Sequence, residues 1–166
     1  MNTPRPKIKI ELTAFDIALE TLGWLALLAF WILVLANYPN LPDNIPTHFN
    51  GSGQPDRYGA KGNIFTLTIV ASMLFLFMTL LNRMPHVFNY LVEITTENAL
   101  RQYTNATKMM RFLKVTIVLI FGLISFETIQ SSMGESEELT FWFLPLTLGM
   151  IFIPIAFFII KSIKIK

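Results

Sequence analysis

The chain has 166 residues, of which 53% are hydrophobic and only 14% are charged. Soluble domains carry about 25% charged residues, so this excess of apolar side chains predicts a surface that faces lipid. Cysteine is absent, which excludes disulfides, thiolate metal sites and a cysteine nucleophile, and a net charge of +2 gives no support to nucleic-acid binding.

Four apolar runs along the chain each approach the length of a membrane span. They cover residues 17–36, 64–81, 112–130 and 141–160. About 20 apolar helical residues cross a bilayer, and no alternating pattern typical of a barrel is present. We therefore predict an all-α integral membrane fold that forms one domain over residues 1–166. No small-residue cleavage pattern follows the first run, so we expect it to be retained as a helix.

Lys and Arg residues are distributed unevenly among the segments that flank these runs. Eleven of the thirteen fall in the N-terminal segment, in the linker 82–111 with the start of the third run, or in the C-terminal segment. Only Arg57 and Lys61 lie in the segment 37–63. The positive-inside bias then predicts cytoplasmic N and C termini, a cytoplasmic linker 82–111 and an external loop 37–63.

The linker between the second and third runs is long for a connection between packed helices. Two apolar series fall at helical spacing here: Val87, Leu91 and Ile94, then Leu100, Tyr103, Met110, Leu113 and Ile117. We expect the third helix to begin near Thr96 and to extend into the cytoplasm. The segment 85–111 either rests on anionic headgroups or docks a cytoplasmic regulator, and we favour the lipid interpretation.

The external loop 37–63 is rich in residues that restrict the backbone. It holds four of the nine prolines and four of the eight glycines, which predicts an ordered loop. His48 lies in this loop with Asp43 and Asp56 close in sequence. A metal-binding or proton-sensing role is conceivable, but no ligand spacing supports a metal site, so we favour a structural, hydrogen-bonded His48 and expect no cofactor.

Two passages resemble one known family. The stretch LPDNIPTHFNGSGQPDRYGAKG, residues 41–62, resembles the loop pattern LPxxIPxHFxxxGxxDxxGxK in the N-terminal domain of the SdpI-type immunity proteins. The second passage, PHVFNY followed by ENALRQYTNATKMMRFLK, is similar to the segment before that family's third helix. The resemblance implies a multi-pass protein of the bacterial cytoplasmic (inner) membrane. It also implies protection against a secreted peptide toxin and retention of a transcriptional repressor, and it brings no catalytic residues.

We identify candidate ligand- or partner-binding residues in the loop and at the end of the third run: His48, Phe49, Asp56, Arg57, Lys61 and Glu127. Glu127 should lie near the outer boundary of the third helix, at the depth of Arg57 and Lys61. We expect Glu127 to face the bundle and either to pair with one of them or to form a hydrogen bond with the loop, because an unpaired intramembrane carboxylate is costly. A carboxylate that snorkels to the interface is the alternative.

A second set of charges lies near the cytoplasmic end of the predicted bundle. Asp16 and Glu20 are four residues apart and therefore share one face of the first helix. Arg111 and Lys114 of the third helix should reach the same depth. We predict a cross-helix ion pair, and a proton relay is the alternative.

These patterns favour a non-enzymatic role. No nucleophile and base stand at motif spacing, so we expect no enzyme activity. We expect a protein of the SdpI-like type that contacts the lipid bilayer and protects against, or senses, a secreted peptide or envelope component through residues 41–61. The alternative is a small transporter or sensor subunit that uses intramembrane acidic residues.

Overall fold

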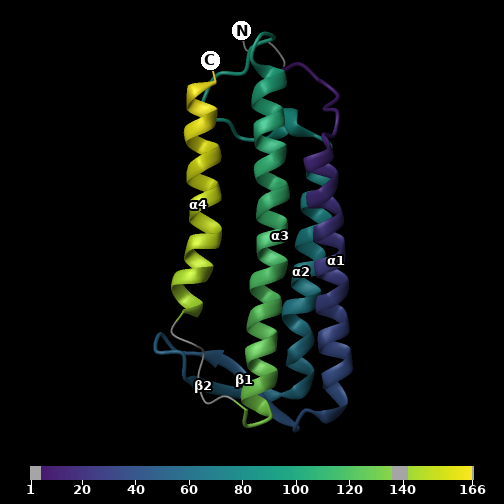
Figure 1. Ribbon diagram of the computed structural model, residues 1–166, viewed down its shortest axis with the longest axis vertical. Helices are drawn as coiled ribbons and strands as arrows, with labels where there is room; N and C mark the ends of the chain where they lie inside the picture. Colours follow the sequence, from purple (N-terminus) through teal and green to yellow (C-terminus); the bar gives the residue numbers. More distant parts are fainter. Residues whose placement is uncertain (1–4, 136–141, 166) are drawn as a thin grey trace.

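Four long helices and one β-hairpin make up an elongated bundle (Figure 1). The computed structural model describes residues 5–135 and 142–165. The helices are α1 (Ala14–Asn37), α2 (Ile64–Leu81), α3 (Ala99–Ser132) and α4 (Phe143–Lys164). Each of these four helices is long and apolar enough to cross a membrane, which confirms the prediction of four candidate spans and suggests a multi-pass membrane protein. The start predicted for the fourth helix, residue 141, lies outside the described residues.

Helix α1 begins three residues before the predicted start because a capping box fixes its first turn. The Thr13 side chain accepts a hydrogen bond from the Asp16 backbone N–H at 3.3 Å, and the Asp16 carboxylate accepts one from the Thr13 backbone N–H at 2.9 Å. These bonds satisfy backbone donors that a helix start leaves free. The apolar run alone does not reveal this start, because the cap itself is polar.

Helix α3 is the centre of the bundle and contacts α1, α2, α4 and the hairpin. Its 34 residues correspond to about 50 Å at the usual helical rise. The main core lies where α1, α2 and α3 meet and includes Phe30, Phe75 and Val118. Gly23 of α1 allows close approach there, since a Cβ at this position would lie 2.8 Å from the Phe75 ring. Helix α4 packs mainly on α3 and buries only Thr147 and Phe158.

The segment between α1 and α2 contains an antiparallel hairpin of β1 (Asn44–Phe49) and β2 (Pro55–Ala60). The fold is mostly helical, as predicted, but the all-α expectation was wrong in this segment, which contains two strands. The sequence did not predict these strands because each contains a proline, and proline argues against a central strand. Pro46 and Pro55 are compatible with a two-stranded sheet, where each strand is an edge. The hairpin lies across one end of the bundle, the hairpin end, opposite both termini (Figure 1).

The linker from α2 to α3 is less helical than its apolar spacing predicts. A short 3₁₀ turn covers Pro85–Val87, and no regular element follows until α3 begins at Ala99, close to the predicted start near Thr96. The Asn98 side chain accepts a hydrogen bond from the Thr95 backbone N–H at 3.0 Å and donates to the Glu93 carbonyl at 3.0 Å. The linker therefore turns into α3 instead of adding a helix of its own.

Candidate functional site

The hairpin is closed by a turn that its own side chains hold. The Asn50 side chain accepts hydrogen bonds from the backbone N–H groups of Ser52 and Gln54 at 2.9 and 3.0 Å. Gly53 has φ 85°, a value that side chains other than glycine rarely tolerate. The turn is thus defined by local hydrogen bonds and by one glycine, as expected for a short loop between antiparallel strands.

Two predicted site residues meet across the strands of the hairpin. His48 of β1 contacts the Asp56 carboxylate of β2 through Nδ1, and both side chains are about half exposed. The strand register is irregular on both sides of His48, which pairs with Arg57 in the ladder. This contact agrees with a hydrogen-bonded, structural His48. Among the described residues no group of three or more His, Asp or Glu side chains is placed to hold a metal ion.

The predicted pairing of Glu127 is wrong. Lys61 pairs instead with Asp43 at 3.1 Å, and its backbone N–H donates to the Asp43 carbonyl at 3.0 Å. The Lys61 ammonium also lies 5.7 Å from the centre of the Tyr38 ring. Asp43 is closer because it directly precedes β1, whose first residue is paired with the last residue of β2. Glu127 is partly exposed and forms no ion pair with Arg57 or Lys61 within the described part of the chain.

A cavity of about 540 Å³ lies between the hairpin and the helices. The hairpin contributes one wall, the first turns of α2 a second, and the last third of α3 with the start of α4 the rest. Its lining includes two of the predicted residues, His48 and Phe49. Arg57, Lys61, Asp56 and Glu127 do not line it. Composition and spacing gave no indication of this cavity, since it depends on how the hairpin packs on α3.

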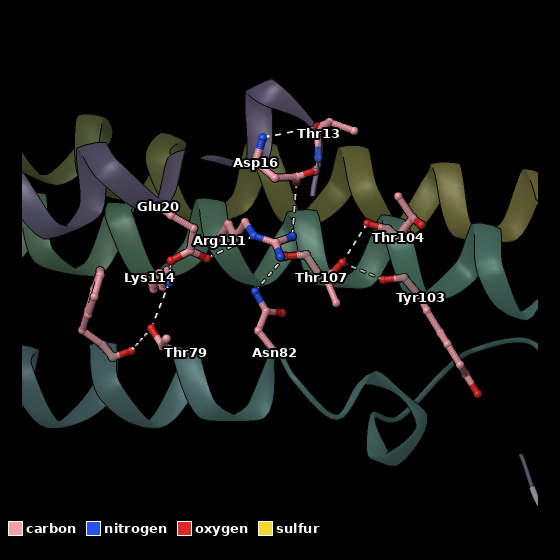
Figure 2. Close-up of polar contacts among 11 residues, drawn as sticks. Thr13, Asp16, Glu20, Thr79, Asn82, Tyr103, Thr104, Thr107, Arg111 and Lys114 are labelled. Atoms are coloured by element: carbon pink, nitrogen blue, oxygen red, sulfur yellow. Dashed lines mark hydrogen bonds and ion pairs between the residues drawn. The ribbon is translucent and has the colours of Figure 1, made fainter. Parts of the chain in front are cut away.

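A cluster of four charged side chains lies nearer the termini, between α1 and α3 (Figure 2). The Arg111 guanidinium contacts Asp16 at 3.2 Å and Glu20 at 3.1 Å, and the Lys114 ammonium contacts the second oxygen of Glu20. The predicted cross-helix ion pair is confirmed. Two acidic and two basic groups balance in charge, as buried charges usually require.

Lys114 is fully enclosed in this cluster, with a side chain that is 0% exposed. Its ammonium donates to the Thr79 hydroxyl of α2 at 2.9 Å and lies 4.5 Å from the centre of the Phe75 ring. Figure 2 shows the Lys114 and Arg111 side chains directed toward Glu20 and Asp16 of α1. The cluster therefore connects three helices and holds their register.

The end of the bundle that carries both termini is closed by the chain's own segments. The Arg5 guanidinium donates to the Phe88 carbonyl at 2.6 Å and lies 5.5 Å from the centre of the Tyr90 ring. The Gln102 side chain donates to the carbonyls of Ser162 and Ile165 at 2.9 and 2.8 Å. The N-terminal segment is thus bound to the linker, and the C-terminal end is bound to the first turn of α3. Docking of a cytoplasmic regulator on residues 85–111 stays a prediction, as an alternative to contact with lipid headgroups.

Comparison with known proteins gives two matches. Residues 24–71 match a family model described as "Domain of unknown function (DUF1648)". This match runs from α1 through the hairpin into α2, so it includes the hairpin and part of the cavity wall. A protein of Archaeoglobus fulgidus, described as "Uncharacterized protein", is 27% identical over 153 residues, which cover 85% of this chain and 84% of that protein.

No solved structure matches this chain. Neither matching description names an immunity protein, so the SdpI-type resemblance stays a prediction. The chain is similar to a domain of unknown function over the segment that builds the hairpin and its neighbouring helices.

Proposed function

We propose that the chain is a non-enzymatic receptor of the bacterial cytoplasmic membrane that protects against, or senses, a secreted peptide. In this proposal the four helices cross the bilayer, both termini are cytoplasmic and the hairpin end is outside. The distribution of Lys and Arg along the sequence supports this orientation, because eleven of the thirteen fall in the N-terminal segment, in the linker with the start of the third run, or in the C-terminal segment.

One observation carries the proposed binding role: a polar strand lies exposed at the end of an otherwise apolar bundle. Three consecutive residues of β2, Asp56 to Tyr58, are exposed, and Tyr58 has 56% of its surface accessible. No further strand pairs with β2 among the described residues. An exposed strand edge offers backbone N–H and C=O groups to an extended peptide, and nearby side chains supply specificity.

The side chains on this strand suit an extended peptide with mixed polarity. The Asp56 and Arg57 side chains offer one charge of each sign, and Tyr58 offers an amphipathic ring, a residue type enriched in binding surfaces. The His48–Asp56 contact keeps β2 aligned with β1. Transport has less support, because the intramembrane carboxylates of Asp16 and Glu20 already have basic partners.

A survival assay tests this proposal. A sensitive bacterium expresses either the natural chain, the His48→Ala, Asp56→Ala double variant, or Glu11→Ala as a matched control at the opposite end, and is challenged with secreted peptide toxins. We expect the natural chain and Glu11→Ala to protect, and the double variant at equal membrane levels to fail. Equal survival with the double variant, or no protection by the natural chain against any toxin, would contradict the proposal.

A further inference from the structure

The cavity beneath the hairpin extends from the polar end of the molecule into its apolar part. The hairpin forms one wall, and the wall farther from the hairpin end includes Leu67 of α2 and Ser125 of α3. Ser125 lies seven residues before the end of α3 at Ser132, which corresponds to about 10 Å along the helix. Ile69, next to this wall on α2, is exposed on the apolar outer surface of the bundle. The cavity therefore borders surface that is suited to lipid.

The cavity walls mix apolar and polar side chains and contain no acidic or strongly basic residue among the described lining residues. The apolar lining residues include Ile45, Phe49, Ile64, Leu67, Ile124 and Phe143. The polar ones are Thr47, His48, Tyr58, Asn63, Thr66, Ser125 and Thr128. No Asp, Glu, Lys or Arg is found among the described lining residues. A volume of about 540 Å³ falls within the range of pockets that hold small ligands. The occupant that fits these walls is neutral, with a large apolar part and a few polar atoms.

One polar group in the cavity lacks a partner. Ser125 is 1% exposed, and its hydroxyl has no hydrogen-bond partner among the described residues. Other hydroxyls on the same helix donate to the carbonyl four residues earlier: Thr128 does so to Ile124 at 2.9 Å and Ser132 to Thr128 at 2.6 Å. An unsatisfied buried hydroxyl costs about 1–3 kcal/mol. A molecule bound in the cavity would remove this cost if it placed a hydrogen-bond acceptor next to the Ser125 hydroxyl.

We propose that the cavity binds the aliphatic chain of a membrane lipid, whose ester or ether oxygen accepts a hydrogen bond from the Ser125 hydroxyl. An extended peptide would bring a donor and an acceptor with every residue into this space, and each would need a partner. A lipid chain brings one or two acceptor oxygens next to a long apolar stretch, which matches the buried, unpartnered Ser125 hydroxyl beside the apolar part of the lining. The bound chain would fill the space between β1 and the helices and would stabilise the packing of the hairpin on the bundle.

This inference does not depend on the proposed peptide receptor function. The lipid would occupy the space between the hairpin and the helices, whereas the proposed peptide pairs with the exposed edge of β2. Tyr58 lies on that edge and also lines the cavity, so the two proposals are separated by their readouts. The test below contains no toxin and measures no survival, so its failure leaves the receptor proposal standing, and the reverse is also true.

The experiment uses the full chain reconstituted in phosphatidylethanolamine–phosphatidylglycerol vesicles that contain a phospholipid with a photoactivatable diazirine in one acyl chain. After illumination, mass spectrometry of fragments locates the labelled residues. We expect the natural chain to be labelled at cavity residues. Ile124→Trp, which fills the cavity, should abolish this labelling, whereas Leu123→Trp, a neighbour that does not line the cavity, should retain it.

A second variant keeps the test decisive if Ile124→Trp does not fold. Ser125→Ala removes only the free hydroxyl, so we expect labelling of the cavity at limiting probe to fall about two- to tenfold, the effect of one hydrogen bond. Labelling confined to exposed helix faces would overturn the inference, as would equal cavity labelling in Ile124→Trp and the natural chain. Displacement of the probe from the cavity by an added apolar peptide would overturn it in favour of a peptide pocket.

Discussion

Replacing Lys114 with Met should destabilise the bundle strongly. Lys114 is fully enclosed and contacts Glu20, Thr79 and the Phe75 ring. Loss of one partner from a buried ion pair typically costs about 3–5 kcal/mol. Here Glu20 keeps a second partner, Arg111 at 3.1 Å, so we expect a smaller loss of about 2–3 kcal/mol in the free energy of unfolding.

The assay is reversible unfolding in mixed micelles by titration with a denaturing detergent, followed by circular dichroism. The matched control is Lys9→Met, which removes an exposed charge that forms none of the described ion pairs and should change stability by less than about 0.5 kcal/mol. The double variant Glu20→Gln, Lys114→Met should recover at least about 1 kcal/mol, because neither charge then lacks its partner.

Two outcomes would refute this reasoning. A loss below about 0.5 kcal/mol for Lys114→Met would mean that the ammonium reaches water or the interface in both states, as lysines near helix ends can. Strictly additive effects of the Glu20 and Lys114 substitutions would mean that the two groups do not interact.

Three further predictions concern single positions. Gly23→Ala should destabilise the bundle by about 1–3 kcal/mol, because the added Cβ would approach the Phe75 ring. Gly149→Ala, whose Cβ would make only ordinary contacts, should not destabilise it, and detergent unfolding compares the two variants. Gly53→Ala should cost about 1–2 kcal/mol, because φ 85° strains a residue with a Cβ, and should increase protease cleavage at the hairpin; unchanged cleavage would contradict this. Burial raises the pKa of Tyr90 above its usual value of about 10, so stability should fall as pH rises above about 10, and Tyr90→Phe should flatten that pH dependence.

The helical part of the fold could be predicted from the sequence because each helix is a long apolar run. The ion-pair cluster was also predictable, since the spacing of Asp16 and Glu20 defines one helix face and Arg111 and Lys114 reach the same depth. Both inferences use local spacing and the known rise of a helix. They do not depend on how distant segments pack.

The hairpin end was harder to predict. Its strands are short and contain Pro46 and Pro55, so period and propensity did not indicate them. The partner of Lys61 depends on the register of the hairpin, which brings Asp43 closer than Glu127. The cavity, too, exists only because β1 packs on α3. No sequence pattern indicates that residues such as Ser125 line a cavity.

The most direct test of the receptor proposal places a photo-crosslinking amino acid at Tyr58, on the exposed strand β2, in living cells that express the chain and meet a toxin against which it protects. A second site, Leu91, is 71% exposed at the opposite end of the bundle and serves as the matched control. The account predicts that the toxin peptide is crosslinked at Tyr58 and not at Leu91. Protected cells with no adduct at Tyr58, or with adducts at Leu91 alone, would contradict it.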